Sequence, residues 1–129
     1  MKTVAGTKQD PTIAFVDTTV DNVTYKLAFS FNAIAEAEAV TNCNLLSGMW
    51  KFLTDREGMN AQQLRGLLYA SLQLAQPEIT LEQAGDMITL DSFFMLQQAV
   101  NAAFIMSLPE KKRQEVIEAA QVIAEPTEN

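Results

Sequence analysis

Glu36, Glu38 and Cys43 are residues whose types could perform acid–base or thiol chemistry. The two glutamates lie in an alanine-rich run of helical character, where residues two apart point about 200° away from each other around the axis. They therefore cannot flank one substrate. A thiol nucleophile needs a base, usually histidine, and this chain of 129 residues has no histidine. These residues predict no catalytic site.

Other sequence patterns typical of catalytic, phosphate-binding or metal-binding sites are also missing. It has no glycine-rich phosphate loop, no CxxC pair and no calcium-loop pattern. Without histidine, most hydrolase triads and most zinc sites are excluded. We therefore expect a protein that is not an enzyme, with no catalytic residues, no metal site and no cofactor. An enzyme is the remaining alternative, although the sequence offers no nucleophile–base pair and no set of metal ligands to support it.

Glu38 is of interest as a structural residue. At helical spacing it shares a stripe with Ile34 and Thr41, whereas Glu36 points toward solvent. A carboxylate on the buried side of a helix needs a partner. We expect Glu38 to be a structural carboxylate that braces the joint between the N-terminal strands and the helices.

The charge and composition limit the classes of partner. The net charge is −7 and the isoelectric point is near 4.4, so phosphate backbones and anionic headgroups are repelled. We expect neither nucleic acid nor membrane as a partner. The single cysteine cannot form an internal disulfide, which is typical of a reducing cytoplasm. No secretory h-region is visible, and the most apolar stretch is shorter than the ~20 residues needed to span a bilayer.

The organisation predicted along the chain is a flexible arm at 1–11, one domain at 12–124 and a polar tail at 125–129. In VTYKLAFSF (23–31), apolar side chains occupy every second position, which is typical of a strand with one face on a core. The preceding run is β-branched and aromatic, and Asp21-Asn22 between the two runs suits a tight hairpin turn. A β-hairpin is therefore expected at the N-terminal end.

Helical periodicity follows the hairpin. A first helix is expected to have Asn32 as its N-cap and to close at Asn42. Further helices are expected around 45–53, at 60–75, after Thr80, at 91–106 and after Pro109. Three capping boxes mark helix starts: Asn60 with Gln63, Thr80 with Gln83, and Ser107 with Glu110. The predicted fold class is mainly α (α+β), a small N-terminal β-hairpin followed by five to six short helices in one compact domain.

Aromatic residues are the candidates for binding a partner. Core packing is the default interpretation, and an apolar groove for a partner helix is the sharper one. The candidate contact residues are Trp50, Phe52, Phe94 and Phe104. The basic triplet Lys111, Lys112 and Arg113 is either a solvated face or a docking point for an acidic segment.

The helix expected at 91–106 is apolar nearly all round, and its polar stripe is limited to Gln97, Gln98 and Asn101. Such a helix is either central to a fold or covered by a partner. Self-association into a homo-oligomer is therefore a further alternative.

Three segments resemble the tail assembly chaperones of long-tailed bacteriophages: YKLAFSFNAIAEAEAVTNCNLL, NAQQLRGLLYASLQ and PEITLEQAGDMI. The family shows a strand ending in Phe-Asn-Ala, a helix with a glutamate, an LR-LL helix and a P-x-x-T-L-E segment. Asn42 stands where the family often has glycine, and Tyr69 stands where tryptophan is common. The resemblance covers roughly residues 24–106.

The resemblance implies a function that is not enzymatic. Such chaperones bind the tape measure protein in the cytoplasm of the bacterial host, help tail-tube protein to assemble around it and leave before the virion matures. Many exist in a second, longer form made by a programmed frameshift. A structural tail or tail-completion component of the virion is the alternative, although tube proteins are normally richer in strands.

Overall fold

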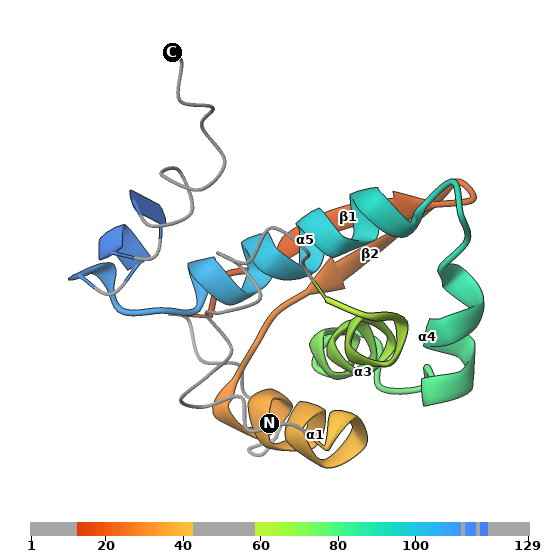
Figure 1. Ribbon diagram of the computed structural model, residues 1–129, viewed down its shortest axis with the longest axis horizontal. Helices are drawn as coiled ribbons and strands as arrows, with labels where there is room; N and C mark the ends of the chain where they lie inside the picture. Colours follow the sequence, from red (N-terminus) through yellow and green to blue (C-terminus); the bar gives the residue numbers. More distant parts are fainter. Residues whose placement is uncertain (1–12, 43–58, 112, 116, 119–129) are drawn as a thin grey trace, which may run out of the picture.

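The computed structural model describes residues 13–42, 59–111, 113–115, 117 and 118 (Figure 1). Its elements are β1 (Val16–Val20), β2 (Val23–Leu27), α1 (Phe31–Thr41), α3 (Ala61–Leu72), α4 (Leu81–Met87) and α5 (Phe93–Met106). Residues 110, 111, 113–115, 117 and 118 are also helical. The predicted class, a mainly helical α+β chain with an N-terminal hairpin, is confirmed. The expected arm, the helix around 45–53 and the polar tail lie outside the described residues.

The hairpin turn has the geometry that the sequence predicted. Val20 pairs with Val23, so that Asp21 and Asn22 form a two-residue loop. Their φ angles are 53° and 67°, in the left-handed region that asparagine and aspartate tolerate better than other residues with a side chain. This turn places β1 antiparallel to β2.

The hairpin has an inner and an outer face, because directly paired residues lie on the same side of a sheet. The inner face packs on α5 and α3, and Thr18 on it is buried. On the outer face, the hydroxyl groups of Thr19 and Thr24 are hydrogen-bonded, with their oxygens 3.0 Å apart. Lys26 Nζ lies 3.2 Å from Asp17 Oδ1, an exposed ion pair worth less than about 1 kcal/mol.

The strand alternation ends four residues earlier than the sequence predicted. β2 stops at Leu27. Ala28, at a position of the alternation that was expected to face water, is fully buried, and its N–H donates to the carbonyl of Ser71 at 2.9 Å. Phe31, expected on the core face, is 71% exposed at the first position of α1. The contact with α3 thus redirects the chain before the periodicity of the strand is complete.

The first helix starts at a different cap from the one predicted. The side chain of Ser30, not of Asn32, accepts the N–H of Ala33 at 3.1 Å. Ser30 still has extended backbone angles, so the helix begins as soon as the chain leaves the strand direction. The predicted C-cap is confirmed: Asn42 has a φ of 57°, and its N–H donates to the carbonyl of Glu38 at 2.8 Å.

Two of the three predicted capping boxes form. Asn60 and Gln63 exchange side chain-to-backbone bonds of 2.8 and 2.9 Å, and Thr80 and Gln83 do the same at 3.1 and 2.9 Å. The prediction for Ser107 was wrong. Its hydroxyl donates to the carbonyl of Phe104 at 2.6 Å and so closes the end of α5. The next helical residue is Glu110, after Pro109.

Helix α3 is the element on which the others assemble. It packs against α1, α4, α5 and β2, and Figure 1 shows it between α1 and the layer formed by α5 and the hairpin. Leu67 and Leu68 are fully buried. The core continues into α5 through Leu96, Val100 and Phe104. It also includes Leu27 of β2 and Phe29 of the segment that follows β2. The rings of Phe29 and Phe104 meet edge to face with centroids 6.0 Å apart. No helix among the described residues has the length and apolar character to cross a bilayer.

Gly66 allows α1 and α3 to approach closely. A Cβ atom at this position would overlap the Cγ2 atom of Thr41. The facing stripe of α1 is correspondingly small, being made of Ala33, Ala37 and Thr41. Glycine is therefore required here by the space between two helices and not by a turn.

We expect Gly66→Ala to lower the free energy of unfolding by about 1–2 kcal/mol, because the overlap outweighs the helix-propensity gain of about 1 kcal/mol. Gly85→Ala on α4 is the matched control. A Cβ atom there meets the flexible side chain of Arg65 at 3.0 Å, so we expect no loss of stability. Urea unfolding of both variants measures the difference, and equal midpoints would contradict the close-packing explanation.

The edge of β2 is covered by one side chain from beyond α3. The Oε1 atom of Gln76 accepts the N–H of Lys26 at 2.8 Å, and its Nε2 atom donates to the carbonyl of Lys26 at 3.0 Å. The same Nε2 atom donates to the carbonyl of Leu72 at 3.0 Å. The carboxamide thus takes the place of a neighbouring strand and fastens the hairpin to the end of α3.

Replacing Gln76 tests this attachment. We expect Gln76→Ala to destabilise the fold by about 1–2 kcal/mol and Gln76→Glu to do about the same, because a carboxylate cannot donate to the two carbonyls. The exposed Gln98→Ala is the control, with a change within about 0.5 kcal/mol. Amide hydrogen exchange at Lys26 reports the edge directly. Unchanged protection of the Lys26 amide in Gln76→Ala would show that a contact other than the Gln76 side chain protects the edge of β2.

Candidate partner-binding site

Helix α5 has one side in the core and one side toward solvent. Leu96, Val100 and Ala103 are fully buried against α3 and the hairpin. The sequence left open whether this nearly all-apolar helix is enclosed by the fold or covered by a partner. Among the described residues it is enclosed on one side alone.

The solvent side of α5 is itself mostly apolar. Phe94 is 62% exposed, and Met95 and Met106 are 40% and 41% exposed. Ala102 and Ile105 are half-buried between them. At 100° per residue these five side chains span an arc of about 120°, opposite the buried residues. We call these five residues the α5 apolar face.

The predicted polar stripe does not shield this face. Gln98 is exposed within the arc, whereas Gln97 and Asn101 are half-buried at its border. The Oδ1 atom of Asn101 is buried without a hydrogen-bond partner. The polar residues therefore lie partly at the boundary with the core, and apolar residues take most of the surface.

The loop before α5 adds to the exposed apolar surface. Leu90 in this loop is 96% exposed, and Phe93, the first residue of α5, is 42% exposed. The loop is ordered by Ser92, whose hydroxyl donates to the carbonyl of Met87 at 2.9 Å and accepts the N–H of Thr89 at 2.9 Å. Leu90 is thus presented to solvent by a structured turn.

The structure separates the predicted aromatic contact residues. Phe94 is the most exposed residue of the α5 apolar face, but Phe104 is 7% exposed and packs on Phe29. Phe104 is therefore a core residue and is not available to a partner in this structure. Its position ten residues after Phe94 places it about 80° away around the helix, which is enough to put it on the buried side. Trp50 and Phe52 lie outside the described residues.

The basic triplet is not one continuous cationic surface among the described residues. Lys111 is exposed, and Lys112 lies outside them. Arg113 is half-buried, with Nη1 at 3.8 Å from Glu110 Oε1 and Nη2 donating to the carbonyl of Leu108 at 3.2 Å. Arg113 therefore interacts with its own chain, which leaves Lys111 as the exposed member of the described pair.

Glu38 is half-buried on α1 beside the small-residue stripe that faces α3. The stripe predicted to be buried was Ile34, Glu38 and Thr41. Thr41 is buried, but the other two positions are taken by the preceding residues, Ala33 and Ala37. The physical reason is the close approach at Gly66, which favours small side chains at the contact. Whether Glu38 braces the joint with the hairpin stays a prediction.

No three acidic or cysteine side chains in the described ranges gather into a metal-binding group. Comparisons of the chain with protein-family models, with curated proteins and with solved structures found no match. Within the part of the chain that the structure describes, the α5 apolar face is the feature that we take as the candidate partner-binding site.

Two phenylalanine substitutions on α5 distinguish its two sides. We expect Phe104→Ala to destabilise the fold by about 3–5 kcal/mol, because it leaves a cavity in the core. Phe94→Ser is expected to change the free energy of unfolding by less than about 0.5 kcal/mol. Thermal or urea unfolding of both variants measures the contrast. A large loss in Phe94→Ser would mean that this ring is covered within the protein.

Proposed function

We propose that this protein is a tail assembly chaperone of a long-tailed bacteriophage, which binds the tape measure protein and assists tail-tube assembly. The α5 apolar face is the observation that carries the proposal. The resemblance of the three sequence segments to this chaperone family supports the choice of the tape measure protein as the partner.

The chemistry of the α5 apolar face suits a helical partner. Exposed apolar side chains grouped on one surface are typical of interaction sites, and burying a large one contributes roughly 1.5–3 kcal/mol. Phe94 offers a rigid ring, whereas Met95 and Met106 are flexible and adapt to different partner surfaces. Such a face can cover the apolar stripe of successive amphipathic helices, as a chaperone of a long helical protein requires.

The overall charge supports the same role. A net charge of −7 opposes self-aggregation of a protein that exposes apolar side chains. A complex of chaperone and client would keep this acidic surface outward. As the resemblance implies, the proposed action takes place in the cytoplasm of the bacterial host, before the virion is complete.

Co-expression with the tape measure protein of the same phage tests the proposal. We expect the tape measure protein to become soluble and to co-purify with a tagged copy of this chain. No gain in solubility and no co-purification would refute the proposal. Recovery of this chain from purified virions would instead support a structural tail or tail-completion component.

Variants of the α5 apolar face make the test specific. We expect the double variant Phe94→Ser, Met95→Ser to reduce the co-purified tape measure protein at least about tenfold, as expected when two apolar contacts are lost. Phe31→Ser is the matched control, because Phe31 is 71% exposed on α1, which Figure 1 shows on the other side of α3 from α5. Equal losses in both variants would show that the α5 apolar face is not the contact surface.

The state of the chaperone alone is measured by sedimentation velocity. A homo-oligomer that dissociates in the double variant would show that copies of the chain cover this face before the client arrives.

A further inference from the structure

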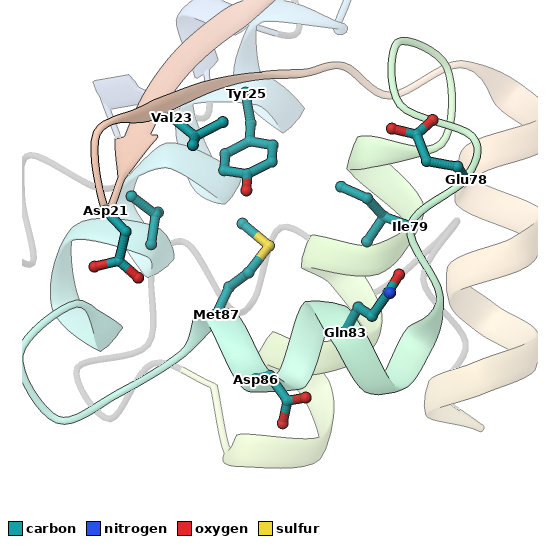
Figure 2. Close-up of a pocket in the computed structure, with 9 residues that line it drawn as sticks. Asp21, Val23, Tyr25, Glu78, Ile79, Gln83, Asp86 and Met87 are labelled. Atoms are coloured by element: carbon teal, nitrogen blue, oxygen red, sulfur yellow. The ribbon is translucent and has the colours of Figure 1, made fainter.

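A hollow of about 560 Å³ lies between the hairpin turn, the loop before α4 and α4 itself (Figure 2). It is distinct from the α5 apolar face, since no residue of that face lines it. Its lining residues are Val20, Asp21, Val23, Tyr25, Glu78, Ile79, Gln83, Asp86 and Met87.

The floor of the hollow is apolar. Figure 2 shows Tyr25, Ile79 and Met87 approaching one another from the hairpin, the loop and α4. All three side chains are half-buried. The Tyr25 hydroxyl points toward Met87, and no hydrogen bond to it is found among the described residues. The floor thus offers apolar contact and one unused hydroxyl group.

The rim of the hollow is acidic. Asp21, Glu78 and Asp86 are all exposed, and in Figure 2 they lie on three different sides of the floor. The ion pairs of the described residues involve other carboxylates, and the lining includes no lysine or arginine. The three carboxylates do not form a metal-binding group. The rim therefore carries three exposed carboxylates beside apolar side chains, with no cation among the residues that line this hollow.

Local hydrogen bonds hold the walls of the hollow in place. The turn at Asp21 is fixed by the paired strands, and the start of α4 is fixed by the capping box of Thr80 and Gln83. The loop between them is held by Gln73, whose Nε2 atom donates to the carbonyl of Ile79 at 2.8 Å. Each wall is thus positioned by bonds within the chain, which lowers the entropy cost of binding a ligand.

We propose that this hollow binds a polypeptide segment of a protein partner in which one or two apolar side chains are flanked by lysine or arginine. The apolar side chains enter the floor, and the flanking cations lie against the carboxylates of the rim. Charge complementarity identifies this occupant, because an acidic rim repels nucleic acid and acidic segments. The inference rests on the proposed function for the partner's identity and specifies which segments of the tape measure protein would be held here.

The probe for this hollow is the synthetic peptide acetyl-Lys-Lys-Leu-Met-Lys-Lys-amide. Two control peptides replace either the two apolar residues by serine or the lysines by glutamate. Titration of the full ¹⁵N-labelled chain, followed by amide chemical shifts, locates binding. We expect saturable shifts at Tyr25, Ile79 and Met87 with the first peptide, at least about tenfold weaker binding of the serine peptide and none of the glutamate peptide.

Charge variants of the chain separate the hollow from the general acidity of the surface. Asp21→Asn, Glu78→Gln and Asp86→Asn together remove the rim charge with nearly isosteric side chains, and asparagine suits the left-handed turn. We expect this triple variant to bind the peptide about tenfold more weakly. Glu36→Gln, Glu82→Gln and Asp91→Asn remove the same charge from exposed positions outside the lining and are expected to weaken binding less than twofold. Unfolding midpoints confirm that both variants fold.

Equal weakening in the two triple variants, or equal binding of the serine peptide, would overturn the inference, since binding would then be non-specific attraction. Concentration-dependent shifts of the same residues without peptide would also overturn it, by assigning the hollow to a second copy of this chain. The outcome is separable from that of the proposed function. Peptide binding here with no rescue of the tape measure protein would refute the function alone, whereas rescue without peptide binding would refute the hollow alone.

Discussion

The burial of α3 on several sides is the constraint on which the rest of the structure depends. Seven of its twelve residues are buried, so it must present side chains to α1, α4, α5 and β2 at the same time. Leucines fill the core side, and Gly66 allows α1 to approach. Gln76 binds the backbone of Lys26 in β2, and Ser71 binds the backbone of Ala28, the residue after this strand. A two-stranded hairpin is only marginally stable alone, so these bonds and the packed inner face keep it in place.

This arrangement also decides what the protein can offer to a partner. Because α3 and the hairpin occupy one side of α5, the opposite side of a helix that is apolar nearly all round is left toward solvent. The position of α4 beside the hairpin turn creates the second feature, the acidic hollow with its apolar floor. Both features follow from packing around α3, and they offer different contacts: an exposed apolar face, and a hollow with an apolar floor and an acidic rim.

Local chemistry made much of the fold predictable. The turn at Asp21 and Asn22, the left-handed cap at Asn42 and the capping boxes at Asn60 and Thr80 all depend on bonds within a few residues, and all four are found. Predictions failed where another interaction competed with the local pattern. Ala28 is buried because α3 accepts its N–H, and Ser107 closes α5 because Pro109 displaces the next helix start. In each case the local pattern was compatible with two outcomes. A tertiary contact selected the outcome at Ala28, and the following proline selected it at Ser107.

The candidate site shows the same division. By itself, the sequence determined that α5 would be apolar on nearly every side, that the chain would be acidic and that no histidine-dependent chemistry would be available. Periodicity gives the angle between two side chains on a helix, but not the direction in which the helix faces. Only the tertiary structure decided that Phe104 lies in the core while Phe94 remains exposed, and that Asp21 of the hairpin turn lines the same hollow as Glu78 and Asp86. The physical reason is that burial is a property of the elements packed around a residue, which its neighbours in the chain do not specify.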